Sequence, residues 1–166
     1  MSPISPRPTR NSPEVLASVV AHLAPRVKAW DETTESSSSL ESIAEELADA
    51  IDCQEDGYEI ARSLEQDAFY SPDAHLVEIL DDTGLLKYQF LKTLETEWVK
   101  ASGIQAPALG SRVLVSKDAP ESVRESIGEV IKNHEDGKST VRFNGQGEGC
   151  GYIIEWERLA PAPQES

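Results

Sequence analysis

The chain has 166 residues, of which 39% are hydrophobic and 27% charged, and its formal net charge is −15. This length suits one ordinary domain or two small ones, and the low apolar fraction predicts a folded chain without a dense core. The negative charge disfavours direct binding to nucleic acid or to an anionic membrane, because like charges repel. No apolar run has the length of a membrane span, and the two cysteines, Cys53 and Cys150, lie far apart. We therefore expect a cytoplasmic protein with both thiols reduced.

Residues 1–12 are rich in proline, which predicts a disordered leader. A helix then begins at the Ser-Pro-Glu run that starts at Ser12, where a capping hydroxyl, a first-turn proline and an acid favour initiation. Apolar residues recur at helical spacing over residues 13–30 and predict an amphipathic helix. Pro25 interrupts this pattern and predicts a kink or stop near Leu23.

The apolar stripe of this first helix ends at Trp30. We interpret the stripe as core, with a docking face for a partner as the alternative. Residues 31–38 combine acids with serines and contain no apolar residue, so they predict a flexible linker. Such a linker makes the first helix separable from the rest, and a separable amphipathic helix is suited to partner binding or dimerisation.

Four further helices are predicted between residues 39 and 101. The first opens with the S-x-x-E spacing of a capping box, from Ser38 to Glu41, and carries one apolar face. The other three are expected at about 57–68, from Ser71 onward, and at about 83–101. Helices joined by such short loops form a compact antiparallel bundle, and residues 102–108 connect it to the C-terminal region.

Residues 109–161 predict a small β-barrel. Short β-branched runs bounded by glycine, proline or charged residues are typical of strands. Five such runs occur, at 112–115, 127–131, 140–143, 152–156 and 158–161. Asp136-Gly137, between the second and third runs, supplies the positive φ angles of a hairpin turn. Five short strands leave no exposed edge if the sheet closes into a barrel, whereas an open sheet would expose two edges. Residues 162–166 are expected to form a tail.

Four segments of this region follow one another in a recognisable order. They are Gly110-Ser-Arg-Val-Leu-Val, Ile127-Gly-Glu-Val, Thr140-Val-Arg-Phe-Asn-Gly and Trp156-Glu-Arg-Leu. This order resembles the SH3-like small barrels of the KOW and Tudor type. Such barrels serve in RNA binding, methyl-ligand reading, enzyme accessory subunits and scaffolding, so the resemblance implies a fold more than a function. The region holds seven basic and nine acidic residues, which argues against RNA binding.

The predicted fold class is therefore α+β, with an N-terminal acidic helical bundle followed by a five-stranded SH3-like barrel. Acidic residues are concentrated in residues 31–100, which hold nineteen acids and four bases. One interpretation is a solvated face that keeps a small bundle soluble. The other is a surface that meets a basic partner protein and speeds association by electrostatic steering. The candidate partner-binding residues are Glu45, Glu46, Asp49 and Asp56 for a charged contact, and Trp30 and Tyr152 for an apolar one.

No residue pattern predicts a catalytic site, a metal site or a cofactor. The segment from Asp52 to Gly57 lacks ligands that a calcium loop requires, and the three histidines share no ligand spacing. The glycine-rich run at residues 145–151 presents Cys150 as the one nucleophile worth testing. No basic residue lies near it in sequence to favour the thiolate.

These features predict a non-enzymatic protein-interaction module in which the bundle and the barrel bind a partner protein. Such a module would be an adaptor, an accessory subunit or an inhibitor. Two alternatives stay open. The first is an acidic mimic of nucleic acid that inhibits a DNA- or RNA-handling protein, and the second is an enzyme, or the small subunit of one, that uses Cys150. The sequence leaves the identity of the partner and the oligomeric state open.

Overall fold

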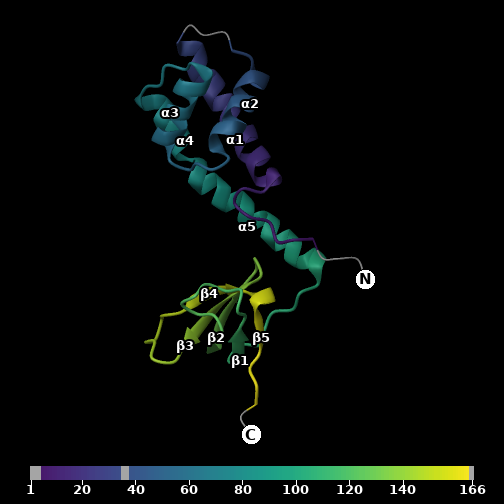
Figure 1. The fold of residues 1–166 in the computed structure, drawn as a ribbon. Helices are drawn as coiled ribbons and strands as arrows, with labels where there is room; N and C mark the ends of the chain where they lie inside the picture. Colours follow the sequence, from purple (N-terminus) through teal and green to yellow (C-terminus); the bar gives the residue numbers. More distant parts are fainter. Residues whose placement is uncertain (1–4, 35–37, 165–166) are drawn as a thin grey trace. The chain divides into compact units, whose positions relative to one another are not determined.

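The described residues of the computed structural model, 5–34 and 38–164, form five α-helices followed by a five-stranded antiparallel sheet (Figure 1). The α+β class is therefore confirmed. The chain divides into two compact units. We call Arg7–Leu94 the helical unit, and we call Glu95–Ser166 together with Met1–Pro6 the sheet unit.

Helix α1 runs without interruption from Pro13 to Thr33, although Pro25 lies inside it. Of the predicted kink or stop near Leu23, the stop is therefore wrong. An internal proline removes a hydrogen bond and costs a helix about 3 kcal/mol. Here Pro25 is exposed, whereas Leu23, Val27 and Trp30 are buried on either side of it, so burial of the apolar stripe outweighs that cost.

The remaining helices are α2 (Leu40–Ile51), α3 (Gly57–Ala68), α4 (Ala74–Asp81) and α5 (Thr83–Ser102). Of these, α2, α3 and α4 begin with a side-chain cap. Ser39 Oγ accepts a hydrogen bond from the Ser42 amide at 3.1 Å, so α2 begins one residue later than the capping box at Ser38 predicts. Asp56 and Asp73 cap α3 and α4 in the same way. Each cap supplies an acceptor to an amide that the helix itself leaves unpaired.

Helix α1 shares one hydrophobic core with the four later helices. The buried side chains include Val15, Val19, Leu23 and Val27 of α1, Ile43 and Leu47 of α2, Ile60 and Leu64 of α3, Leu76 and Leu80 of α4, and Leu86 of α5. The interpretation of the α1 stripe as core is confirmed. Figure 1 shows α1 to α4 packed together, so α1 is an integral part of the unit and not a separable helix.

The segment predicted as a linker, residues 31–38, is helical at its start, because α1 continues to Thr33. Asp31 is buried there, which no solvated linker residue would be. The middle of the segment, residues 35–37, lies outside the described residues.

The predicted disordered leader makes defined contacts from residue 5 onward, while residues 1–4 lie outside the described part of the chain. The Arg10 guanidinium lies 2.8 Å from Glu55 Oε1 and donates to the Gly84 carbonyl oxygen at 3.1 Å. Both contacts are within the helical unit. These contacts hold the last part of the leader against the helices.

The five strands are paired in the order β4-β3-β2-β1-β5, each antiparallel to its neighbours. Their bounds are β1 (Arg112–Val115), β2 (Ile127–His134), β3 (Lys138–Phe143), β4 (Tyr152–Glu155) and β5 (Leu159–Pro161). The predicted hairpin turn joins β2 to β3, and Gly137 in it has a φ of 77°. A short 3-10 helix, Trp156–Arg158, leads into the last edge strand.

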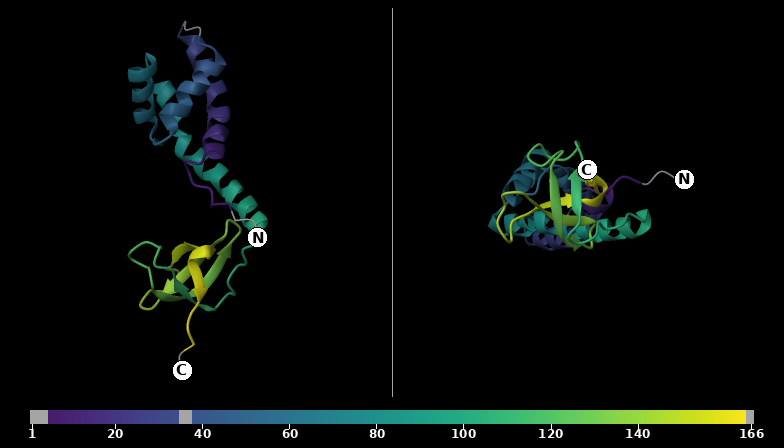
Figure 2. Two further views of the ribbon diagram at one scale, coloured as in Figure 1. Left: turned by 45° about the vertical axis from the view of Figure 1, so that its right-hand side comes forward. Right: turned by 90° about the horizontal axis from the view of Figure 1, so that it is seen from below.

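The sheet curls, but its hydrogen bonding is not closed. The edge strands β4 and β5 pair only with β3 and β1, so the expected closed barrel is not formed by strand pairing. In a flat sheet these edges would lie about 19 Å apart, four strand spacings of about 4.8 Å. The four residue steps from Glu155 to Leu159 span at most about 14 Å. The sheet must therefore curve, and Figure 2 shows its strands twisted across one another.

The concave side of the sheet holds a small core of its own. Its buried members are Val113, Val115, Ala119, Val123, Val130, Val141 and Ile154. The C-terminal part of α5 is tied to this unit, because Lys138 Nζ lies 3.0 Å from the buried carboxylate of Glu95. Asn133 Nδ2 also donates to the Pro107 carbonyl oxygen at 2.8 Å, which holds the connector against β2.

Candidate functional site

Two of the predicted partner-binding carboxylates form a row on the outer face of α2. Glu45 and Asp49 are exposed and lie four residues apart, and Glu41 continues the row by one turn. Like charges at this spacing cost a helix about 0.2–0.5 kcal/mol for each pair. The row therefore carries a repulsive cost, offset in part at Glu41, which lies in the first turn of α2 near the positive end of the helix dipole.

Glu46 and Asp56, the other two predicted carboxylates, have local roles as well. Glu46 is half-buried, and its Oε1 accepts a hydrogen bond from Ser42 Oγ at 3.2 Å. Asp56 is the N-cap of α3, where its Oδ1 accepts from the Glu59 amide at 3.0 Å. A substitution at Asp56 therefore changes helix stability unless the new side chain can also cap.

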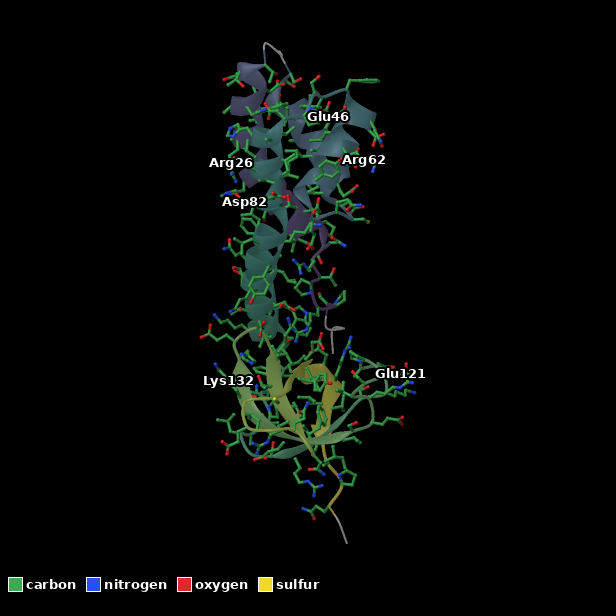
Figure 3. The ribbon with its side chains drawn as sticks, turned by 90° about the vertical axis from the view of Figure 1, so that its left-hand side faces the viewer. Arg26, Glu46, Arg62, Asp82, Glu121 and Lys132 are labelled. Atoms are coloured by element: carbon green, nitrogen blue, oxygen red, sulfur yellow. The ribbon has the colours of Figure 1, made fainter. Side chains whose placement is uncertain are left out.

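None of these four carboxylates has an ion-pair partner among the described residues. The helical unit holds eighteen acidic and seven basic residues, a net charge of −11. Four of its seven basic side chains pair with other carboxylates: Arg10 with Glu55, Arg26 with Asp82, Lys28 with Glu32 and Arg62 with Glu59. Figure 3 shows Arg26 beside Asp82, with Glu46 elsewhere on the unit. We refer to Glu41, Glu45, Glu46, Asp49 and Asp56 as the acidic face.

Trp30, predicted as an apolar contact residue, is buried in this structure. Its side chain is 3% exposed and stacks on Tyr70 with a ring separation of 6.2 Å. Its Nε1 donates to Asp73 Oδ1 at 3.0 Å. The Leu76 amide and then the Trp30 indole hold the pKa of Asp73 below its ordinary value by hydrogen bonding. The Trp30 side chain therefore links α1 to the N-cap of α4 by a hydrogen bond.

Tyr152 is accessible, as the prediction requires. It is 42% exposed on edge strand β4 and meets Phe143 edge to face, with ring centres 5.8 Å apart. The next residue, Ile153, is also exposed. Because successive side chains of a strand point to opposite faces, β4 exposes one apolar side chain on each face of the sheet.

The sheet unit contains two cavities, neither of which has Tyr152 in its lining. One, of about 340 Å³, is mainly apolar and is lined in part by Pro107, Trp156 and Leu159. The other, of about 420 Å³, is lined in part by the Arg142 guanidinium and by Glu129, which form an ion pair at 2.9 Å. Arg112 lines the same cavity.

Lys87 was not identified from the sequence, yet it is one of the most buried side chains of the helical unit, at 1% exposure. Its Nζ donates to Asn11 Oδ1 at 3.0 Å, to the Ile51 carbonyl oxygen at 2.6 Å and to the Gln54 carbonyl oxygen at 3.2 Å. Burial lowers the pKa of Lys87, and the nearby Glu55 carboxylate opposes this shift. The sequence does contain a signal for this burial, because Lys87 lies three residues before Phe90 and therefore on the apolar face of α5.

The candidates for covalent or metal chemistry are scattered. Cys53 and Cys150 are both exposed and neither is in a disulfide. Across residues 5–34 and 38–164, no three His, Cys, Asp or Glu side chains form a group that could hold a metal ion. His134 is hydrogen-bonded to Thr140 Oγ1 at 2.9 Å, and His75 lies 3.8 Å from Glu78 Oε2. These histidines therefore belong to local contacts and not to a shared site.

Comparison of the chain with protein-family models, with curated proteins and with solved structures found no match in any of the three. In the part of the chain that the structure describes, no helix has both the length and the apolarity needed to cross a membrane.

Proposed function

We propose that this protein is a non-enzymatic interaction module whose helical unit binds a basic partner protein through the acidic face. The observation that carries the proposal is the uncompensated charge of that face. Its carboxylates have no described counter-ion, while four of the seven basic side chains of the same unit pair with other carboxylates. The i,i+4 row of Glu41, Glu45 and Asp49 sets like charges beside one another, and such a row is suited to a partner that supplies the opposite charge.

The acidic face would act mainly on the rate and specificity of binding. Complementary charge steers diffusional encounter and raises association rates, and it repels acidic competitors. If the partner handles DNA or RNA, the carboxylates stand where phosphates would, and the module inhibits it by occupying its basic groove. This inhibitor role is the narrower form of the same proposal.

For the sheet unit we propose an SH3-like barrel that serves as a second contact surface. The support is the five short antiparallel strands, the 3-10 helix before the last strand and the curvature imposed by that connection. The exposed Tyr152 and Ile153 on edge strand β4 are its candidate contact residues. Apolar contacts of this kind persist at salt concentrations that weaken the charged ones.

The proposal is tested by affinity capture from a lysate of the source organism, with washes at about 0.1 M and about 0.5 M salt, over which the Debye length falls roughly twofold. We expect wild type to retain a basic protein at low salt and to release it at high salt. The double variant Glu45→Gln/Asp49→Asn should lose it at both.

The matched control is Glu125→Gln/Glu148→Gln, which removes two exposed charges from the sheet unit. It should behave as wild type does. Equal loss in both variants would show that net charge alone is sensed, and retention by Glu45→Gln/Asp49→Asn would rule out the acidic face. Adding Asp56→Asn removes a further charge while keeping a cap, since asparagine caps as well as aspartate.

A further inference from the structure

A cavity of about 180 Å³ lies in the helical unit, lined in part by Trp30, Asp31, Phe69 and Tyr70. An apolar cavity of about 150 Å³ accepts a molecule of the size of benzene, so this one has room for a planar cationic group. It lies where two helices end, because α1 ends at Thr33 and α3 ends at Ala68. Neither helix has a basic residue in its last turn. Helix C-termini carry partial negative charge and favour a cation.

Asp31 is the residue that points to a ligand. Asp31 lines the cavity and is 2% exposed, and its Oδ2 has no hydrogen-bond partner within the described residues. A buried carboxylate oxygen without a partner is costly, since it has lost its water without gaining a hydrogen bond in exchange. A bound cation would supply both the charge and the hydrogen bonds that Asp31 lacks.

Two buried neighbours lie close by. Tyr70 Oη and Glu46 Oε2 meet no partner at ordinary hydrogen-bond distance and angle among the described residues, but the Tyr70 hydroxyl is near enough to the Glu46 carboxylate to interact with it. Burial, and then the Glu46 and Asp31 carboxylates, raise the pKa of Tyr70 above its ordinary value, so its hydroxyl keeps its proton. A neutral phenol can accept a hydrogen bond from a cation while its own proton faces a carboxylate.

Phe69 is a second, independent sign of function. It ends α3 with a φ of 61°, a left-handed conformation that glycine normally supplies at this position. Phe69 is one of the residues that line the cavity, but it is 90% exposed, so folding gains almost nothing from its burial. A strained backbone that holds an exposed aromatic ring at the mouth of a cavity is typical of a ligand clamp.

We propose that this cavity binds the guanidinium group of an arginine presented by the basic partner. Asp31 accepts its N–H groups, Tyr70 Oη accepts one more, and the rings of Trp30, Tyr70 and Phe69 supply the apolar and π surfaces on which a guanidinium packs. The inference rests on the proposed function, and it assigns that function a specific anchor beside the acidic face.

The test is calorimetric titration of the full chain with a hexa-arginine peptide and, separately, with L-argininamide. Asp31→Asn keeps the shape of the side chain and removes the charge, and we expect it to weaken peptide binding about tenfold or more. The matched control Glu41→Gln removes one exposed charge from the same unit, and we expect a change of about twofold at most.

Two further measurements separate a binding role from a structural one. Asp31→Asn should raise the Tm of the free protein, because it removes an unpartnered buried charge. Phe69→Gly should leave Tm unchanged or higher, because it relieves the left-handed backbone, and yet it should weaken peptide binding. A fall in Tm for both variants together with unchanged binding would assign both residues to folding and overturn the site.

Each outcome of the titration is decisive. If Asp31→Asn binds the peptide as Glu41→Gln does, the cavity is not the anchor, and the proposed function stands without it. If wild type does not bind the peptide at low salt, the proposed function fails as well. If L-argininamide binds as tightly as the peptide, the ligand is a small cation, and the assignment to a partner's side chain is overturned.

Discussion

The Lys87 ammonium group connects three segments of the helical unit through hydrogen bonds. It donates to Asn11 before α1, to the last residue of α2, Ile51, and to Gln54 in the following loop. A cation near the C-terminus of a helix also meets the negative end of its dipole. One side chain of α5 therefore satisfies carbonyl groups that the end of α2 leaves unpaired.

Lys87→Met should lower the free energy of unfolding by about 1–3 kcal/mol at pH 7, because it leaves buried acceptors without a donor. Since burial lowers the pKa of Lys87 in the folded state, the unfolded chain binds more protons between the folded and the ordinary lysine pKa. Stability from this group therefore rises with pH in that window. Urea unfolding of both proteins at pH 7 and pH 10 should show the difference between them growing with pH.

The unfolded chain begins to lose the Tyr70 proton in the same pH range, but Tyr70 is present in both proteins and cancels from that difference. Its raised pKa by itself makes stability fall above the ordinary tyrosine pKa, because the unfolded chain loses that proton first. A difference between wild type and Lys87→Met that shrinks as pH rises would contradict the direction of the Lys87 shift.

At the scale of elements, the contact between α3 and α4 depends on a glycine. Gly57 is the first residue of α3, and its amide donates to Asp81 Oδ1 at 3.0 Å. A Cβ at Gly57 would lie 2.6 Å from the Val77 carbonyl oxygen and equally close to the Asp81 amide nitrogen. The backbones of the two helices are therefore too close for any side chain.

Gly57→Ala should destabilise the protein by about 1–3 kcal/mol, because α4 must move to admit the methyl group. Gly84→Ala is the matched control in the first turn of α5. Its Cβ would meet only Glu55, at 3.5 Å, in ordinary contact, and we expect a gain of about 0.5 kcal/mol from helix propensity. Thermal unfolding of the two variants measures both effects, and equal changes in Tm would refute the close-contact explanation.

Element positions were predictable from the sequence because their signals are local. The capping residues, the apolar periodicity of α2 and the Asp136-Gly137 turn each act within a few residues, and the structure places helices and strands close to where these signals lie. The continuity of α1 through Pro25 was not predictable. Whether an internal proline ends a helix depends on how much apolar surface is buried on either side of it.

At the scale of the molecule, charge is divided unequally between the two units. The helical unit carries −11, whereas the sheet unit, with twelve acidic and eight basic residues, carries −4. Self-repulsion of this size keeps a protein soluble but opposes compaction. Most of the repulsion between like charges that opposes folding therefore lies in the helical unit, which carries the acidic face.

Raising NaCl from about 0.01 M to about 0.1 M shortens the Debye length from about 30 Å to about 10 Å. We expect the free energy of unfolding in urea to rise by about 0.5–1 kcal/mol over this range, because repulsion along the acidic face is screened. Glu45→Gln/Asp49→Asn should show a smaller rise. A fall in stability with salt would mean that the internal ion pairs, and not the acidic face, dominate the electrostatics.

The sequence by itself determined the α+β class, the approximate element bounds and the unequal distribution of charge, because these follow from local patterns and composition. Only the tertiary structure decided that Trp30 and Asp31 are buried, that the sheet curls without closing its hydrogen bonds, and that Asp31, Phe69 and Tyr70 line one cavity. The sequence predicted Asp31 to be a linker residue because its neighbours on the C-terminal side are polar. Its burial results from the packing of the ends of α1 and α3, which lie far apart in the chain, and no local signal encodes that contact.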